Sequence, residues 1–66
     1  MAPAQWMKSN RIKYAEIAER AGVTGVTVSR TMAGTAHNIK VIDTVIEMSK
    51  GAVTAQDFFD IRQAVA

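Results

Sequence analysis

Residues 14–33 read YAEIAERAGVTGVTVSRTMA, two short segments separated by the three residues Gly22-Val23-Thr24. Apolar residues recur at helical spacing in the first segment, at Tyr14, Ile17, Ala18 and Ala21. Gly22 follows this segment, where a helix favours a left-handed C-terminal residue. Thr24 is a natural N-cap for a second helix from Gly25 to Ala33. The stretch therefore predicts two short helices, from Lys13 to Ala21 and from Gly25 to Ala33, joined by a tight turn.

The two helices are expected to cross closely, because the residue types between them are small or apolar. Ala18 is small where the helices would cross, and Gly22 carries the backbone around the turn without the penalty of a Cβ atom. The apolar seam between the helices is predicted to consist of Ile17, Ala21, Val23 and Val28.

The rest of the chain adds three further helical segments. Pro3 fits the first turn of a helix that carries Trp6 and Met7 and ends near Ser9-Asn10. Asn38 or Thr35 can cap an amphipathic helix from Ile39 to Lys50. The stripe expected to face the core consists of Ile39, Ile42, Val45, Ile46 and Ser49. Gly51 stops this helix, and Thr54 caps a last one in which Asp57 completes a capping box.

These segments predict an all-α fold, a compact bundle of about five short helices in a single domain, 1–66. The β-branched residues between positions 23 and 28 could suggest a strand. Helix caps and glycines bound that run and no partner strand is visible, so a helix is the better interpretation. A chain of 66 residues has a small core, and its stability is modest unless it pairs with another chain.

Composition narrows the classes of function. The 48% hydrophobic content favours a folded domain over a disordered segment. The chain has no Cys and one His, which excludes disulfides and thiolate ligands and makes a zinc site unexpected. No apolar run is long enough to span a membrane, and residues 1–5 show no secretory signal, so a cytoplasmic location is expected. No clustered carboxylates or Gly-rich phosphate loop are present. We therefore expect no enzyme, no cofactor, no metal and no small-molecule ligand.

Charge is unevenly distributed along the chain. Residues 1–40 contain six basic and two acidic residues, a formal charge of +4. Residues 41–66 contain two basic and four acidic residues, a formal charge of −2. A basic half suits a polyanionic partner, although chance can also produce such an asymmetry in a short chain.

Residues 18–30 carry a more specific signal. They contain Ala-x-x-x-Gly-Val-Thr, followed by Val-Ser-Arg at positions 28–30. This pattern resembles the helix-turn-helix of lambda-repressor-like and lac-repressor-like regulators. The order of segments after it, from Ile39 to Lys50 and then residues 51–59, resembles the Cro-type regulators of phages and mobile elements. The resemblance covers roughly residues 12–60 and favours the Cro-type class, because the likeness to the lac-repressor class ends after the second helix of the motif. One position departs from the pattern: Thr31 stands where these regulators usually have an aliphatic residue, so Met32 or the methyl group of Thr31 has to fill the seam.

The resemblance implies a regulator, expected to be a repressor, that reads operator half-sites through the major groove of DNA. Its recognition helix would run from about Thr24 to Ala33. The residues expected to read bases are Val26, Thr27, Ser29 and Arg30. Arginine binding two acceptors of guanine is the commonest specific contact, and valine can contact a thymine methyl group. Val26 could instead belong to the core, and Arg30 could pair with a neighbouring acid.

Contacts to DNA phosphates are expected at both ends of the motif. The candidates are Lys13, Tyr14, Thr24, Gly25, Thr35, His37, Asn38 and Lys40. Such contacts position the protein and make binding depend on salt. Thr24 would act both as a helix cap and as a phosphate ligand. Gly25 either lets the backbone approach a phosphate or only starts the helix.

A homodimer on a palindromic operator is expected, because one such motif contacts one half-site. Phe58 and Phe59 cannot both point into a small core from one helix, so one is expected to pack inward. The candidate dimer residues are Phe58, Phe59, Ile61 and Val65. Alternatively, this set only closes the core.

Two other classes of function stay open from the sequence. One is a small helical protein that binds or inhibits a protein partner without sequence-specific DNA contacts. The other is an architectural or recombination accessory protein that binds and bends DNA.

Overall fold

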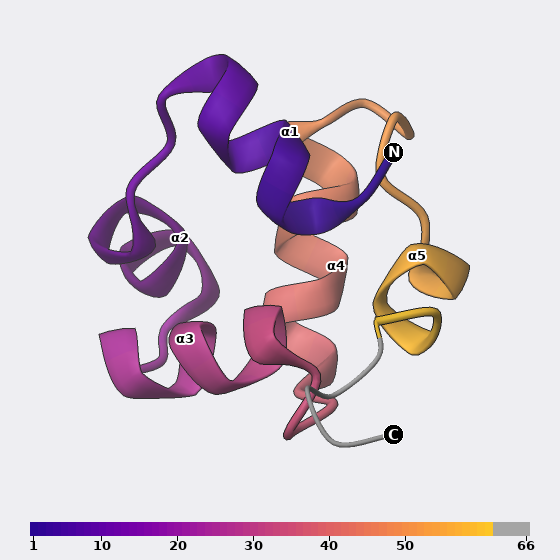
Figure 1. Cartoon of the computed structure of the whole chain (residues 1–66). Helices are drawn as coiled ribbons and strands as arrows, with labels where there is room; N and C mark the ends of the chain where they lie inside the picture. Colours follow the sequence, from indigo (N-terminus) through magenta and orange to yellow (C-terminus); the bar gives the residue numbers. More distant parts are fainter. Residues whose placement is uncertain (62–66) are drawn as a thin grey trace.

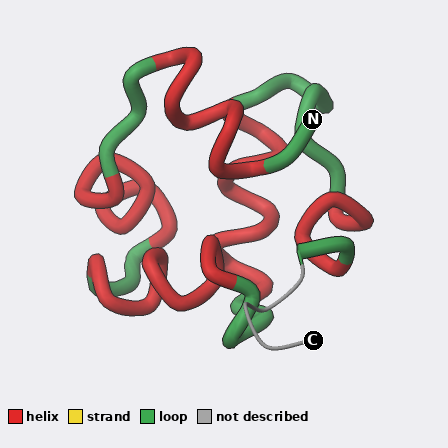
Figure 2. The backbone as a smooth tube through the Cα atoms, viewed as in Figure 1, coloured by secondary structure: helices red, strands yellow, loops and turns green. Residues whose placement is uncertain are grey.

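Five short helices make up the described part of this computed structural model, which covers residues 1–61. They are α1 (Pro3–Asn10), α2 (Tyr14–Ala21), α3 (Gly25–Ala33), α4 (Ile39–Met48) and α5 (Ala55–Phe59). No strand forms within residues 1–61, as the tube in Figure 2 shows. The all-helical prediction is therefore confirmed, and the boundaries of α3 are those expected. Helix α2 begins one residue later than expected and α4 ends two residues earlier.

Helix α4 forms the centre of the molecule. It packs against α2, α3 and α5, and α2 also packs against α3 (Figure 1). In the view of Figure 1, α1 lies across the upper end of α4, α2 and α3 lie on its left, and α5 lies on its right. The Cα radius of gyration, 10.6 Å, is close to the value of about 11 Å expected for a compact chain of this length.

Local hydrogen bonds explain where the helices begin. Thr24, Asn38 and Thr54 have extended backbones, and each side chain accepts a hydrogen bond from a backbone N–H of the first turn. Thr54 and Asp57 form the expected capping box. Pro3 starts α1, where its missing N–H removes no helical hydrogen bond. The capping residues predicted from the sequence are thus confirmed for α3, α4 and α5.

The core gathers side chains from all five helices and from the turn before α5. Its buried apolar members are Trp6, Met7, Ile17, Ala18, Val28, Met32, Val41, Ile42, Val45, Val53 and Phe58. Ala21 and Val23, expected in the seam between α2 and α3, are half-buried against this core. Thr31 and Met32 are both buried, so together they fill the position where an aliphatic residue was expected.

The expected apolar stripe of α4 is wrong at one position. Ile39 is 71% exposed, whereas Val41, which was not in the expected stripe, is fully buried. Ile39 lies six residues before Val45, which places it about 120° around the helix from that buried side chain. The packing of α4 against α2, α3 and α5 covers the side that carries Val41 and Val45, so Ile39 faces away from the core.

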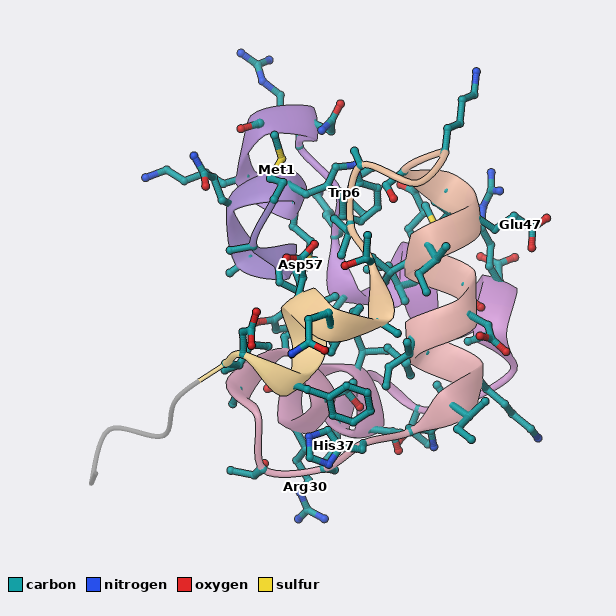
Figure 3. The ribbon with its side chains drawn as sticks, turned by 90° about the vertical axis from the view of Figure 1, so that its right-hand side faces the viewer. Met1, Trp6, Arg30, His37, Glu47 and Asp57 are labelled. Carbon is teal, nitrogen blue, oxygen red and sulfur yellow. The ribbon has the colours of Figure 1, made fainter. Side chains whose placement is uncertain are left out.

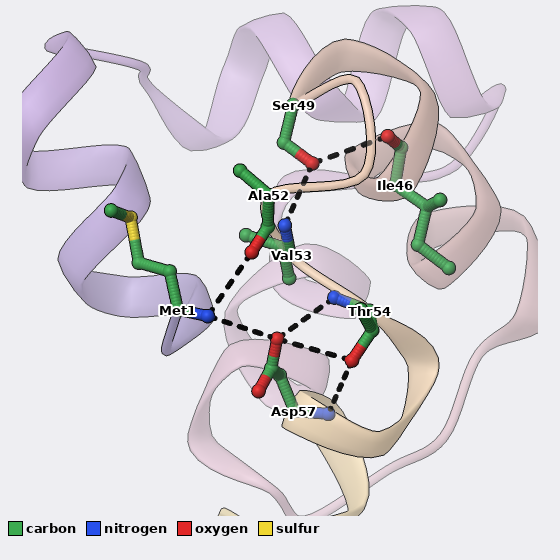
Figure 4. Close-up of polar contacts among 7 residues, drawn as sticks. All are labelled: Met1, Ile46, Ser49, Ala52, Val53, Thr54 and Asp57. Carbon is green, nitrogen blue, oxygen red and sulfur yellow. Dashed lines mark hydrogen bonds and ion pairs between the residues drawn. The ribbon is translucent and has the colours of Figure 1, made fainter.

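The turn between α4 and α5 is joined to the start of the chain by polar contacts (Figure 4). The Ser49 hydroxyl donates to the Ile46 carbonyl at 3.2 Å and accepts from the Val53 N–H at 3.0 Å. The Met1 amino group donates to the Ala52 carbonyl at 3.0 Å and forms a salt bridge with Asp57 at 3.2 Å.

In the described part of the chain, no helix has the length and apolar character needed to cross a membrane.

Candidate nucleic-acid interface

The turn between α2 and α3 determines the direction of α3. Gly22 has a left-handed backbone with φ +73°, a conformation that costs little only for a residue without Cβ. The N–H groups of Gly22 and Val23 both donate to the Ala18 carbonyl, at 2.9 and 3.0 Å. These bonds satisfy the end of α2 while the chain reverses. Because Ala18 is small and buried, α3 can pack closely against α2.

The first turn of α3 presents polar groups at the surface. The Thr24 hydroxyl accepts a hydrogen bond from the Thr27 N–H at 3.3 Å, and the two hydroxyl oxygens lie 3.1 Å apart. Thr24 and Gly25 are exposed, and no atom lies within 4 Å of the place that a Cβ on Gly25 would occupy. The N–H groups at the start of a helix lack helical partners and carry partial positive charge. This end of α3 is therefore open to an anion.

The outer face of α3 carries the candidate base-reading residues. Val26 is 59% exposed and Arg30 is exposed, and the two are four residues apart on one side of the helix. Thr27 and Ser29 flank them and are half-buried. Val26 is thus a surface residue and does not belong to the core.

Arg30 extends from the molecule into solvent (Figure 3). Within residues 1–61 one salt bridge is found, between the Met1 amino group and Asp57, so Arg30 has no carboxylate partner there. His37 lies at the same end of the molecule as Arg30, as Figure 3 shows. A guanidinium with this exposure and no ion-pair partner among residues 1–61 is available to a ligand.

The candidate phosphate ligands differ in what their side chains already do. Lys13 is the N-cap residue of α2, Tyr14 begins that helix, and Lys40 lies in the first turn of α4; all three are exposed. The Thr35 hydroxyl donates to the Arg30 carbonyl at 3.0 Å, so its proton is engaged in ending α3. The Asn38 Oδ1 atom accepts from the Val41 N–H at 3.2 Å, which leaves the Asn38 side-chain N–H groups as donors.

The candidate dimer residues differ in how far they are buried. Phe58 is 1% exposed and belongs to the core, so its expected place in a dimer surface is wrong. Phe59, the next residue, lies about 100° further around α5 and is 57% exposed. Ile61 is half-buried against the core, and Val65 lies outside the described residues. The expectation that one phenylalanine packs inward and the other does not is confirmed.

One contact near the interface has no signal in the sequence. The rings of His37 and Phe59 lie with their centroids 5.0 Å apart and their planes at 47°. The two residues are separated by 21 others, and neither helical periodicity nor a capping pattern relates them. The end of α5 is thereby placed beside the loop that follows α3.

A pocket and one carboxyl group with a shifted pKa lie outside the exposed face of α3. An open pocket of about 240 Å³ between α2 and α4 is lined by Arg20, Thr44, Glu47 and Met48. The pKa of Asp57 is lowered, first by the hydrogen bond from the Thr54 N–H and then by the Met1 amino group. Among residues 1–61, no cluster of three or more His, Asp or Glu side chains could hold a metal ion.

Comparison of the chain with protein-family models, with curated proteins and with solved structures finds no match.

Proposed function

We propose that this protein is a cytoplasmic, sequence-specific DNA-binding regulator, a repressor of the lambda-repressor-like, Cro-type class found in phages and mobile elements. The observation that carries the proposal is the exposed face of α3, with Arg30 unpaired within residues 1–61 and Val26 beside it. Helix α3 follows a three-residue turn and packs against α2 and α4. A helix held in this way fits the major groove of B-DNA, which is about as wide as one helix.

Arg30 is the principal base-reading residue in this proposal. Its guanidinium donates two hydrogen bonds to O6 and N7 of guanine, and Val26 contacts a thymine methyl group. Thr27 and Ser29, which are half-buried, bind base edges or phosphates at the margins of this face. The bases recognised thus include a G·C pair at the position that Arg30 faces.

Phosphates on either side of the groove are bound by the ends of three helices. Thr24 and Gly25 supply the start of α3, and Lys13 and Tyr14 the start of α2. Thr35, His37, Asn38 and Lys40 supply the loop after α3 and the start of α4. Their types and positions suit phosphate, since N–H groups at helix starts and lysine side chains are its usual ligands. Thr35 contributes least, because its hydroxyl proton is already donated to Arg30.

The regulator binds a palindromic operator as a homodimer. Each chain offers a single α3, which reads one half-site, and two half-sites about one helical turn apart require two protomers. The exposed Phe59, together with Ile61 and Val65, is the surface proposed for the second copy.

The test uses fluorescence anisotropy with a duplex selected by the protein from a randomised library, and with an unselected duplex as reference. We expect tighter binding to the selected duplex and a steep loss of affinity between 50 and 200 mM salt, about 100-fold for four phosphate contacts. Arg30→Ala is expected to weaken binding to the selected duplex by about 5- to 150-fold, equivalent to about 1–3 kcal/mol.

Arg20→Ala is the matched control, because it removes the same charge from another surface. Arg20 and Glu47 line the same pocket. Figure 3 shows Glu47 and Arg30 at opposite ends of the molecule, so Arg20 lies far from the proposed DNA surface. The proposal is wrong if the two variants bind alike or if the wild-type protein binds no duplex. Equal affinity for selected and unselected duplex would instead favour an architectural protein.

A further inference from the structure

The loop that joins α3 to α4, residues 34–38, is anchored at both ends but not in its middle. The N–H groups of Gly34 and Thr35 donate to the carbonyls of Thr31 and Arg30, at 3.2 and 3.0 Å. Asn38 caps α4 through its contact with the Val41 N–H. Within residues 1–61, by contrast, Ala36 and His37 make no hydrogen bond. Backbone hydrogen bonding therefore leaves the position of His37 undetermined.

Two side chains contact this loop, Phe59 at the end of α5 and Ile61 two residues after it. The Phe59 ring lies against the His37 imidazole, with centroids 5.0 Å apart. Ile61 lies against Gly34 so closely that a Cβ built on this glycine would be 2.7 Å from Ile61 Cγ2. Gly34 also has φ +83°, so a side chain at this position would be strained as well as crowded.

We propose that Phe59 is a positioning residue, which holds His37 and the 34–38 loop in place for contact with the DNA backbone. This inference rests on the proposed function. Phe59 itself touches no DNA, and it acts by reducing the number of positions that His37 adopts before binding. A loop that is ordered in advance loses less entropy when it binds, which increases affinity without a new contact.

A contact of this kind predicts a defined loss of affinity. An aromatic pair is worth about 0.5–1.5 kcal/mol beyond the area it buries, which corresponds to a factor of roughly 2 to 12 in an equilibrium constant. Phe59→Ala is therefore expected to weaken DNA binding by roughly 2- to 12-fold. Phe59→Tyr keeps the aromatic ring and is expected to bind DNA with wild-type affinity.

The Phe59 ring is also 57% exposed, so its substitution can affect a dimer. The affinity is therefore measured on a duplex that carries a single half-site, to which one protomer binds. The control is Gln56→Ala, on the same short helix. The Gln56 side chain is exposed and donates to Asp60 at 2.9 Å, so it has no part in the contact between Phe59 and His37. Thermal unfolding of each variant reports any loss of folded protein.

Nuclear magnetic resonance of the free protein supplies a readout that does not depend on DNA. The His37 ring protons are expected to shift when Phe59 is replaced by Ala, since they lose the ring current of its aromatic ring, and not when it is replaced by Tyr. In the His37→Ala background, Phe59→Ala is expected to add no further loss of affinity, because Phe59 acts only through His37.

The outcomes separate this inference from the function on which it rests. If the wild-type protein binds the selected duplex and Arg30→Ala weakens binding, but Phe59→Ala binds the half-site as the wild type does, only the role of Phe59 is refuted. Additive losses in the double variant, or His37 signals unchanged by Phe59→Ala, refute it too. A wild-type protein that binds no duplex overturns both proposals.

Discussion

Among the single residues, Thr31 is the clearest case of a polar group accommodated in the core. It is 1% exposed, and its hydroxyl donates to the Thr27 carbonyl one turn back at 2.8 Å. This bond avoids the cost of an unpaired buried donor and leaves the methyl group to pack against apolar neighbours. The residue therefore fills an aliphatic position, although with a hydroxyl that the position does not need.

We predict that Thr31→Val stabilises the protein by about 1 kcal/mol, because a methyl group replaces the buried hydroxyl. The Thr27 carbonyl keeps its ordinary helical hydrogen bond, so no polar atom is left unpaired. Thermal unfolding should show an increase in Tm of about 4–8 °C. The control Thr31→Ser, which deletes the methyl group instead, should lower Tm. A valine variant less stable than the wild type would mean that the hydroxyl bond is required.

Asp57 makes stability depend on pH. The Thr54 N–H, which donates to Asp57 Oδ2 at 2.8 Å, and then the Met1 amino group hold the pKa of this carboxyl below its usual value of about 3.9. Both partners favour the charged form. The carboxylate therefore stabilises the folded state fully above the unfolded pKa, and this contribution is lost as the pH falls through the lower, folded pKa.

We predict that Asp57→Asn is less stable than the wild type at pH 6, and that this difference shrinks as the pH falls below about 4. Urea unfolding at several pH values measures the difference directly. A difference that stays constant from pH 6 to pH 2 would show that the charge of Asp57 contributes nothing to stability.

At the scale of elements, α2 and α3 form a unit whose geometry depends on a single glycine. Gly22 turns the chain at φ +73° and directs two N–H groups to the Ala18 carbonyl. Gly25, three residues later, lies in the first turn of α3 without a left-handed backbone. A Cβ at either position would meet no atom within 4 Å. Backbone conformation alone therefore distinguishes the two glycines.

We predict opposite effects for the two alanine substitutions. Gly22→Ala should destabilise the protein by about 1–2 kcal/mol, the cost of a left-handed backbone for a residue with a Cβ. Gly25→Ala should stabilise it by about 0.4–1 kcal/mol, because it reduces the freedom of the unfolded chain without strain in the folded one. Urea unfolding of both variants tests the pair. The same sign for both would contradict this account of the turn.

At the scale of the whole molecule, the proposed base-reading residue Arg30 and the loop residue His37 lie at the same end (Figure 3). Phe59, which is 57% exposed, contacts His37 there. The proposed dimer surface therefore adjoins the proposed DNA surface. Two copies joined there would have their α3 helices held in a defined relation.

We predict that the protein sediments as a dimer at high concentration and that Phe59→Asp makes it a monomer, since a charge in an apolar contact is costly. Ile39→Asp is the control, because Ile39 is the most exposed of the large apolar residues in the described part of the chain and lies on α4. A wild-type protein that is already monomeric, or a Phe59→Asp variant that stays dimeric, would refute the proposed interface.

Much of the fold is predictable from short stretches of the chain. The capping residues Thr24, Asn38 and Thr54 and the left-handed Gly22 act on backbone groups within five residues of themselves. Their effect depends on local chemistry, so the helix boundaries can be predicted from the sequence to within one or two residues. The exposed side of α3 was also expected, because helical periodicity places Arg30 opposite the seam formed by Val28.

Three features could be known only from the packed structure. Val41 is buried and Ile39 is not, and Phe58 enters the core and Phe59 does not. The third is the contact between the Phe59 ring and His37. In the first two cases the two side chains are both strongly apolar, so their chemistry does not distinguish the buried residue from the exposed one. Periodicity shows that a helix has an apolar side, but neighbouring helices decide which part of that side they cover. That choice depends on contacts between residues far apart in the chain, which local patterns do not record.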